Sequence, residues 1–474
     1  MNLCSTMVTT SYHALRGGTR IRLLAAAIGA LALSQVAMAD RAFGGANPGD
    51  LLWENRGQSA PQGDVRAIDG EGTVVVATGE IGGNCTRPFT CRWFVRAHDA
   101  RTGATLWEDN PGPGSPTGTA RAVAVQGGRV FAAGFQASNF VVRAYDLGDG
   151  TVLWDRRIQF GGAWSVVASN GNVFVAGNIV SRIGGVIKQQ FAVLLLDAQT
   201  GATLWESETQ AFPFALAGSV RVQGDRTFVA GSVTSTAPSG VSLLVRAHDT
   251  KTGAVLWEDL MPDGYFFVGR DADDLAVSHD LLFVAAAVIN PNSTAIGFDY
   301  IVRAYDVRTG ALAWMDHVQH GDGGGASRLG VGAGKVFAFG WDCDVTVFCD
   351  SKVRAYDPQT GALHWESRFT GPGGDSLFPA DAFAVRGRQV FVGASLLNAP
   401  QENYDWSVRS YDAIRGTLQW ENRIEDHSFQ SAPIALKALG DRLYVAGSVF
   451  KSDGSSDFMV RAYRASTDGS NDKP

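Results

Sequence analysis

Apolar and polar residues alternate along this chain in short runs that end at glycine-containing turns. The clearest example, residues 95–108, reads VRAHDARTGATLWE. The alternation in its first four residues predicts a strand with one buried face, and DARTG predicts a turn whose glycine takes a left-handed backbone. ATLWE predicts the returning strand. Segments such as 122–134 (AVAVQGGRVFAAG) predict a second strand–turn–strand unit of the same kind.

The first unit recurs along the whole chain, which is the mark of a repeat architecture. Besides 95–108, full copies stand at 142–155, 193–206, 245–258, 302–315, 353–366 and 408–421. Two half-copies complete the set: LLWE at 51–54 lacks the VRA strand, and VRAY at 460–463 lacks the Trp strand. The residues aligned with Phe131 recur every 43 to 55 positions and are Val76, Phe131, Phe174, Phe228, Phe283, Phe337, Phe391 and Tyr444.

Each repeat therefore holds four antiparallel strands, and eight repeats occupy nearly all of residues 40–465. Four-stranded sheets repeated around an axis form a β-propeller, which leaves few exposed sheet edges. The fold class is thus all-β, an eight-bladed propeller. Segment 51–54 is expected to pair with 460–463 and close the ring. An open solenoid, the alternative, would need polar capping repeats.

The N-terminus has the layout of a secretory signal peptide. Residues 1–39 hold three Arg and no acid, the apolar run LLAAAIGALAL at 23–33, and small residues at Ala37 and Ala39. We predict cleavage after Ala39; a membrane anchor or a buried helix is the alternative. The product is expected to be exported, periplasmic or extracellular, with a flexible tail at 466–474.

Composition narrows the classes of partner. The chain is 45% apolar and 18% charged, which excludes disorder for its bulk. Its net charge is −7, and loss of residues 1–39 leaves 37 basic against 47 acidic residues, a net charge of −10. Such a chain is a poor general binder of nucleic acid or anionic membranes. No other stretch is apolar enough for membrane insertion, and the oligomeric state stays open.

Four cysteines remain after the predicted cleavage, in two pairs of the same spacing. We predict the disulfides Cys85–Cys91 and Cys343–Cys349, because each pair flanks an expected hairpin loop and export leads to an oxidising compartment. A zinc site built from all four is the alternative, although their spacing is not typical of zinc ligands.

The pattern A-x-D-x-x-T-G-x-x-x-W resembles the tryptophan-docking repeat of pyrroloquinoline-quinone (PQQ) type propellers, over nearly all of 51–463. Eight blades are common in that superfamily, and each Trp packs between adjacent blades. The resemblance implies this structural role for Trp53, Trp107, Trp154, Trp205, Trp257, Trp314, Trp365 and Trp420.

Two branches of this superfamily give two functional hypotheses. Quinoprotein dehydrogenases oxidise alcohols or sugars with PQQ and usually Ca²⁺, whereas other propellers are non-catalytic, such as the outer-membrane assembly factor BamB. This sequence lacks the adjacent Cys pair of the alcohol dehydrogenases, and their metal-binding set and catalytic Asp have no residue-by-residue match here. It also has no CxxCH haem-attachment motif.

Most repeated polar residues have a structural interpretation. Arg on the VRA strand and the acid after Trp are expected to form cross-strand ion pairs, as for Arg96 with Glu108. The Asp before T-G is expected to bind backbone N–H groups and fix the turn. Three Trp outside the docking set, Trp93, Trp341 and Trp406, are expected near blade rims, where they would offer a partner-binding surface.

One aligned position differs from repeat to repeat and is the candidate site. A packing position would stay apolar, so this column is expected to face the central funnel. Arg on one side and Asp on the other would suit a polar ligand or a peptide; a solvated channel without ligand is the alternative. The column is Arg66, Arg121, Trp164, Gly218, Asp273, Ser327, Asp381 and Ile434.

We therefore predict an exported, non-catalytic scaffold that binds a protein partner or a small polar ligand. Arg66, Arg121, Trp164, Asp273 and Asp381 are the candidate binding residues, with no catalytic residue, cofactor or metal assigned. A Ca²⁺ site at Asp271, Asp273 and Asp274 is the metal alternative. The alternative function is a PQQ-dependent alcohol or sugar dehydrogenase of reduced size.

Overall fold

The computed structural model consists of strands and turns throughout its described residues. These are 41–42, 47–59, 63–83, 90–234, 241–261, 265–266, 275–289, 298–318, 323–343, 349–370, 382–398, 403–424 and 430–466. No helix in this part of the chain has the length and hydrophobicity to span a membrane. The predicted signal peptide, Cys85, residues 467–474 of the tail, Asp271, Asp273, Asp274 and Asp381 lie outside these ranges.

The strands form eight four-stranded antiparallel blades, numbered here from the channel outward along each blade. Blades 1 to 4 are β3 Gly63–Glu71, β4 Val74–Ile81, β5 Arg92–Asp99, β6 Thr105–Asp109; β7 Gly118–Gln126, β8 Arg129–Gln136, β9 Asn139–Asp146, β10 Val152–Ile158; β11 Gly161–Ser169, β12 Asn172–Ile183, β13 Val186–Asp197, β14 Thr203–Glu208; and β15 Ala215–Gln223, β16 Arg226–Val233, β17 Ser242–Asp249, β18 Val255–Leu260.

The second half of the ring repeats this order. Blades 5 to 8 are β20 Leu275–Ser278, β21 Leu281–Ile289, β22 Phe298–Asp306, β23 Leu312–Val318; β24 Gly323–Gly332, β25 Lys335–Cys343, β26 Cys349–Tyr356, β27 Leu363–Phe369; β28 Ala382–Arg386, β29 Gln389–Asn398, β30 Asn403–Asp412, β31 Leu418–Ile424; and β32 Gln430–Leu439, β33 Arg442–Phe450, β34 Ser456–Arg464, β2 Leu51–Ser59. Two short strands, β19 Tyr265–Phe266 and β1 Arg41–Ala42, pair with β21 and β2.

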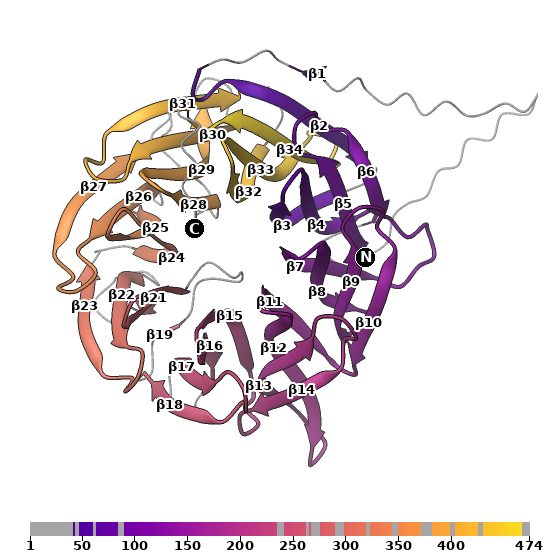
Figure 1. Ribbon diagram of the computed structural model, residues 1–474, viewed down its shortest axis with the longest axis vertical. Coiled ribbons are helices and arrows are strands. Elements are labelled where there is room, and N and C mark those ends of the chain that lie inside the picture. The colour runs from indigo at the N-terminus through magenta and orange to yellow at the C-terminus, as the bar shows by residue number, and fades with distance from the viewer. Residues whose placement is uncertain are drawn as a thin grey trace, which may run out of the picture. The chain divides into compact units, whose positions relative to one another are not determined.

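The eight-bladed ring is closed by its two ends, as the half-copies predicted. Strand β2 pairs with β34 in register Trp53↔Ala462 and Glu54↔Arg461, so the first described long strand is the outermost strand of the last blade. Figure 1 shows the indigo start of the chain beside its yellow end, with the other blades between them around a central axis. The predicted fold class and its mode of closure are confirmed.

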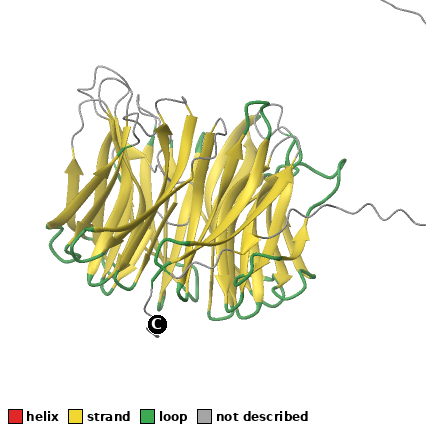
Figure 2. Ribbon diagram, turned by 90° about the horizontal axis from the view of Figure 1, so that it is seen from above, coloured by secondary structure: helices red, strands yellow, loops and turns green. Residues whose placement is uncertain are grey.

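Hairpin turns set the two faces of the ring. The turns between the first and second strands and between the third and outermost strands open on one face, which we call the turn face. The other connections open on the opposite face, the loop face (Figure 2). On the turn face, the Asp99 carboxylate accepts backbone N–H groups of Arg101 and Thr102 and the Thr102 hydroxyl. The hydrogen bond from the Thr102 side chain lowers the pKa of Asp99, so this repeated Asp fixes the turn as predicted.

The repeated Trp residues join each blade to the next. Each indole Nε1 donates to a carbonyl in the turn that follows the third strand of the next blade, from Trp53 to Ala100 at 3.1 Å round to Trp420 and Ala465. Each ring also lies against a glycine: a Cβ on Gly310 would stand 2.6 Å from Cδ2 of Trp257. Only glycine fits there, and its φ of +72° is the left-handed backbone that the turn requires.

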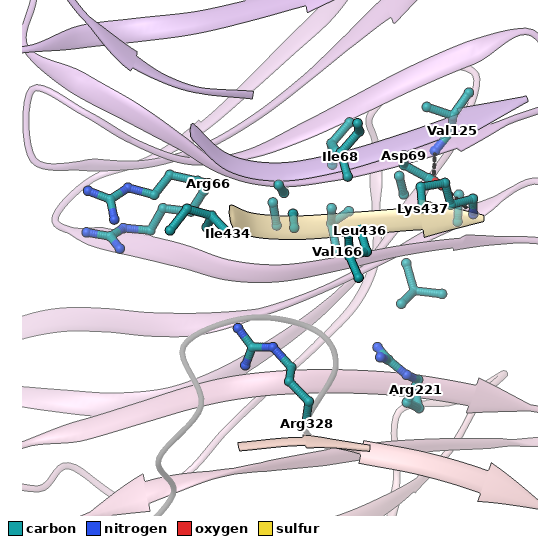
Figure 3. Close-up of a pocket in the computed structure, with 18 residues that line it drawn as sticks. Arg66, Ile68, Asp69, Val125, Val166, Arg221, Arg328, Ile434, Leu436 and Lys437 are labelled. Atoms are coloured by element: carbon teal, nitrogen blue, oxygen red, sulfur yellow. Dashed lines mark hydrogen bonds and ion pairs between the residues drawn. The ribbon is translucent and has the colours of Figure 1, made fainter. Parts of the chain in front are cut away.

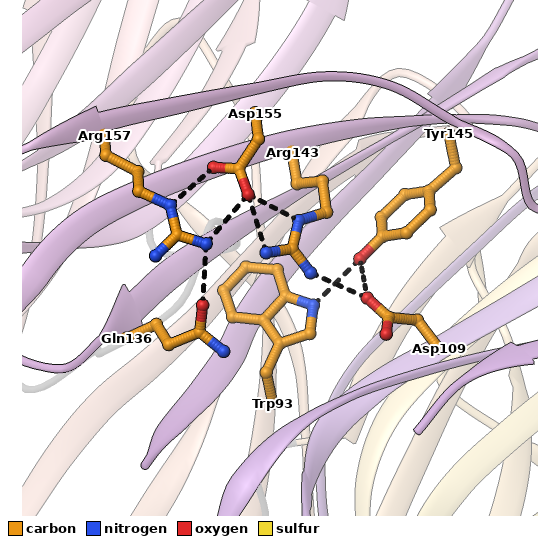
Figure 4. Close-up of polar contacts among 7 residues, drawn as sticks. All are labelled: Trp93, Asp109, Gln136, Arg143, Tyr145, Asp155 and Arg157. Atoms are coloured by element: carbon orange, nitrogen blue, oxygen red, sulfur yellow. Dashed lines mark hydrogen bonds and ion pairs between the residues drawn. The ribbon is translucent and has the colours of Figure 1, made fainter. Parts of the chain in front are cut away.

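Cross-strand ion pairs line the outer half of the blades, which confirms the structural interpretation of the repeated Arg. Arg143 Nη2 lies 2.7 Å from Asp155 Oδ2, and Arg143 Nη1 lies 2.8 Å from Asp109 of the preceding blade (Figure 4). Equivalent Arg–acid partners face each other in five more blades: Arg96 and Glu108, Arg246 and Glu258, Arg354 and Glu366, Arg409 and Glu421, and Arg461 and Glu54.

The prediction that the extra Trp residues form a rim surface was wrong for two of them. Trp93 and Trp406 are fully buried. The indole of Trp93 donates to the Tyr145 hydroxyl at 2.9 Å, and the Arg143 guanidinium lies over its ring (Figure 4). Each packs against the next blade, Trp93 at Tyr145 and Trp406 close to Gly447.

The cysteine positions can be compared with the predicted disulfides. Cys343 and Cys349 are directly opposed across the β25–β26 hairpin, which is the placement a bridge requires. Cys91 is fully buried immediately before β5. Both disulfides remain predictions.

Candidate functional site

The variable column coincides with a β-bulge on the innermost strands. In six blades the pairing of the first two strands slips by one residue, and the residue skipped is the column residue. A bulge leaves one residue unpaired and redirects its side chain. These six residues are Arg66, Arg121, Trp164, Gly218, Ser327 and Ile434.

The bulge side chains make different contacts in different blades. Arg66 Nη2 lies 2.5 Å from Oε1 of Glu80, which is 1% exposed, and Thr119 donates its hydroxyl to the same carboxylate. The Arg121 guanidinium stacks 4.0 Å from the centre of the Trp164 ring. A cation held over an indole face is stabilised by the ring quadrupole. The structure thus brings Arg121 and Trp164 together, two of the five predicted binding residues, across neighbouring blades.

A cavity of about 270 Å³ lies along the channel beside this column. Arg66, Arg121 and Ile434 line it, whereas Trp164 does not. Figure 3 shows Arg66 and Ile434 toward one end and Asp69 with Lys437 toward the other, while Arg221 and Arg328 reach in from further strands. A second cavity of about 260 Å³ also has Arg221 in its lining.

The charged side chains among the described lining of the first cavity are mostly basic, and the rest of the lining is apolar. The lining contains Arg66, Arg121, Arg221, Arg328 and Lys437, with Asp69 as its acid. Asp69 is held from two sides, because Lys437 Nζ lies 2.6 Å from one oxygen and the Val125 amide donates to the other at 2.7 Å.

Burial of acids behind this lining has an electrostatic cost. Burial raises the pKa of Asp64, and the positive charge of Arg66 opposes that shift. Asp64 lies 3.7 Å from Arg66 Nη2. The Arg66 guanidinium therefore forms ion pairs with two carboxylates, Asp64 and Glu80. These contacts hold the Arg66 side chain in place beside the cavity.

Repeat alignment missed three lining residues, Arg221, Arg328 and Lys437. Each stands one to three positions after a bulge, on strands β15, β24 and β32. Because side chains alternate along a strand, a one-residue slip changes which residues face the channel. These three residues can be identified only from the register shift at the bulge, and the amino-acid sequence does not show where that shift occurs.

No group of three or more His, Cys, Asp or Glu side chains in the described ranges is arranged to hold a metal ion. The suggested Ca²⁺ ligands Asp271, Asp273 and Asp274 are outside these ranges, as is the predicted binding residue Asp381.

The chain belongs to the propeller family described as outer membrane protein assembly factor BamB. The model of this family matches residues 94–264, 138–338 and 298–466, which together run from the third strand of blade 1 to the third strand of blade 8. The predicted resemblance to PQQ-type propellers is thereby confirmed. No curated protein matches the chain significantly.

Solved structures share the fold at low sequence identity. BamB from Moraxella catarrhalis is 16% identical with a TM-score of 0.52, and the match covers 88% of this chain and 99% of that one. A quinohemoprotein alcohol dehydrogenase from Pseudomonas putida HK5 is 15% identical with a TM-score of 0.53, covering 90% and 77%. A europium-containing methanol dehydrogenase is 13% identical with a TM-score of 0.53, covering 84% and 85%. At these identities the likeness concerns the fold alone.

Proposed function

We propose that this protein is an exported, non-catalytic propeller scaffold that binds a protein partner in the cell envelope. The observation that carries the proposal is membership of the BamB family over residues 94–466. The layout of residues 1–39 supports export.

The distribution of polar residues supports a scaffold. The repeated Asp, Arg and acidic residues are engaged in turns and cross-strand pairs within the blades, as at Asp99 and at Arg143 with Asp155. The residues that differ between repeats lie on the channel and toward the loop face. A partner that distinguishes this propeller from others would recognise those residues, because only they depart from the common pattern.

A PQQ-dependent dehydrogenase is the second candidate, favoured by the fold that the chain shares with a methanol dehydrogenase and a quinohemoprotein alcohol dehydrogenase. The cationic lining at Arg66, Arg121 and Arg328 fits the carboxylates of PQQ. For Ca²⁺ the described lining offers only Asp69, and both of its oxygens already have partners. The described residues therefore do not fit the complete cofactor site, and we derive no redox step.

Two experiments distinguish these functions. The first is cross-linking of the exported protein in intact envelopes, followed by purification and mapping of the linked residues. The scaffold function predicts one partner at near-stoichiometric yield with cross-links on the loop face. The second is reconstitution with PQQ and Ca²⁺ and dye-linked oxidation of alcohols and sugars. Tight quinone binding with turnover, and no stoichiometric partner, would overturn the proposal.

A further inference from the structure

Exposed large apolar side chains fall into two sets among the described residues. Twelve lie on the outermost strands or their turns, where the repeat places them in blade after blade, as at Leu204 and Leu363. The other five lie in or beside blade 3 and have no equivalent in the repeat. They are Phe160, Ile183, Val186, Ile187 and Phe214.

Three of the five stand at the end of a hairpin that outgrows its blade. Strands β12 and β13 have 12 residues each and stay paired to Ile183↔Val186, whereas β8 and β9 of blade 2 have 8 each. Four further residues extend a hairpin by about 13 Å. Neighbouring strands stop earlier, since β11 pairs only as far as Ile179 and β14 as far as Ala192. Figure 1 shows the hairpin projecting beyond the outline of the ring beside β14.

The two other residues flank the base of this hairpin. The Phe160 carbonyl accepts the Val180 amide at 2.8 Å, and Phe214 follows Phe212, which pairs with Gln189. Phe160 is 59% exposed and has a φ of +55°, a backbone that a bulky residue adopts only at a cost. A strained and exposed aromatic residue at this point indicates a surface that has a binding function.

The charge of the hairpin is opposite to that of the chain. The hairpin, residues 172–197, contains Arg182 and Lys188 near its projecting end, and its one acid, Asp197, lies at the opposite end, paired with Asn172, in a protein whose net charge is −7. Arg182 is exposed, and no ion pair joins either cation to another described residue. The occupant of this surface is therefore expected to be anionic.

The shape of the hairpin end favours a lipid surface over a protein surface. Val186 and Ile187 are successive residues of a strand, so they point to opposite faces, yet they are 58% and 56% exposed. A flat protein surface would cover one face only, whereas the boundary between lipid headgroups and acyl chains surrounds whatever enters it. Apolar groups enter this boundary by about 5–10 Å, which the projecting length allows. Cations beside them meet anionic headgroups, and Phe is among the apolar residues that peripheral elements bury at this boundary.

We propose that the end of the β12–β13 hairpin, with Phe160 and Phe214 at its base, docks this protein peripherally onto an anionic lipid surface. Ile183, Val186 and Ile187 enter the headgroup boundary, and Arg182 and Lys188 contact lipid phosphates. The acidic charge of the whole chain argues against general adhesion to such membranes; the hairpin is a local exception that fixes one orientation. This inference does not depend on the protein partner proposed above.

The test is co-sedimentation of the exported protein with vesicles of phosphatidylethanolamine and phosphatidylglycerol, and with vesicles of phosphatidylcholine. Ile183→Asp with Ile187→Asp is expected to lower the partition coefficient for the anionic vesicles by about tenfold or more, because the hydrophobic contribution is lost. The matched control is Leu204→Asp with Leu363→Asp, which alters aliphatic residues of similar exposure, 54% and 46%. This control should bind as the unaltered protein does, and thermal unfolding verifies that all variants are folded.

A second pair of substitutions tests the charge. Arg182→Gln with Lys188→Gln should abolish the preference for anionic over neutral vesicles. The proposal is overturned if the unaltered protein does not sediment with anionic vesicles, or if hairpin and control variants lose binding equally. It is also overturned if the hairpin variants bind vesicles normally but lose a cross-linked protein, which would identify a protein as the occupant.

Discussion

The outermost and innermost strands of the blades follow opposite rules. On the outermost strands, the docking Trp, its hydrogen bond to the next blade and the glycine beneath its ring recur in all eight blades. On the innermost strands, a bulge recurs in all six blades in which the structure describes the column residue, but that residue ranges from Gly218 to Arg121 and Trp164. The backbone geometry recurs but the side chain does not. The bulge is therefore a requirement of the fold, whereas its side chain can differ from blade to blade.

The same contrast separates the two faces of the ring. On the turn face the Asp turn is built alike in successive blades, as at Asp99 and Asp306. On the loop face the described connections differ, from the two residues between β8 and β9 to the eight between β6 and β7, and the β12–β13 hairpin projects there. Repeated positions hold the ring together, and unrepeated ones are where the ring can vary and still fold.

The largest expected effect is the loss of a docking Trp. Trp53 is fully buried, belongs to the closing strand and donates to Ala100 of blade 1. Trp53→Ala is expected to lower the free energy of unfolding by about 3–5 kcal/mol, since it leaves a cavity and removes one hydrogen bond to the Ala100 carbonyl, which still accepts from Arg442 and Tyr444. Trp164→Ala, the matched change on an innermost strand, is expected to cost about 1–2 kcal/mol, because Trp164 is only half-buried and loses one hydrogen bond to Asn178 and the stacking of Arg121 on its ring. Denaturant unfolding of both variants would measure this, and equal losses would abolish the distinction.

The sequence predicts the features that repeat and misses those that do not. Blade number, closure, Trp positions and the Arg–acid pairs all follow from a periodic pattern, because periodicity averages over eight examples. Arg221 and Arg328 were missed because a bulge shifts the side-chain alternation, and a bulge has no residue signature here. The hairpin end at Ile183 and Val186 was missed because the alternation there predicts a strand but not how far it extends beyond its neighbours. Trp93 was assigned to a rim because its spacing gives no measure of burial.

A docking glycine is expected to matter nearly as much as its Trp. Gly310 has a φ of +72°, and a Cβ there would meet the Trp257 ring at 2.6 Å. Gly310→Ala combines backbone strain with displacement of the indole, and we expect a loss of about 2–4 kcal/mol in the free energy of unfolding.

A turn glycine that has no Trp ring beside it can distinguish the effect of backbone strain from the effect of displacing the indole. Gly224 has a φ of +57° and no atom within 4 Å of its Cβ position. Gly224→Ala should therefore show strain alone, about 1 kcal/mol. If both glycine variants unfold at the same denaturant concentration, contact with the Trp contributes nothing.

Two blades carry His where five others carry Tyr and blade 3 carries Leu196, and the buried His residues should make the fold sensitive to acid. Burial lowers the pKa of His98 to about 3, and burial also lowers the pKa of His248. A His with a lowered folded-state pKa contributes full stability above its unfolded pKa near 6.5 and loses it as pH falls toward the folded value. The unaltered protein is thus expected to lose about 1–2 kcal/mol of its free energy of unfolding through His98 as the pH falls from 7 to 5, and His98→Tyr should remove this loss.

The measurement is denaturant unfolding of both proteins at a series of pH values. Tyr145 occupies the equivalent position in blade 2 and stacks on Trp107 at 5.6 Å, much as His98 packs against Trp53, so the replacement is compatible with the site. Parallel pH profiles for the variant and the unaltered protein would show that His98 is not the titrating group.

The smallest effect is expected from the cross-strand ion pairs, although they are among the most regular features of the sequence. Arg409 Nη2 lies 3.0 Å from Glu421, in a pair that remains partly solvated at 12% and 28% side-chain exposure. Blade 3 lacks this ion pair, because Leu194 stands opposite Glu206 there. The two strands of blade 3 are nevertheless paired, so the ion pair is not needed for strand pairing. A double-mutant cycle with Arg409→Leu and Glu421→Gln should give a coupling of about 0.2–1 kcal/mol, typical of exposed pairs. Arg409→Leu alone removes its stacking on Phe369, 4.3 Å away, as well as its charge, so only the cycle isolates the ion pair. A coupling several times larger would mean that the ladder, and not Trp docking alone, holds neighbouring strands in register.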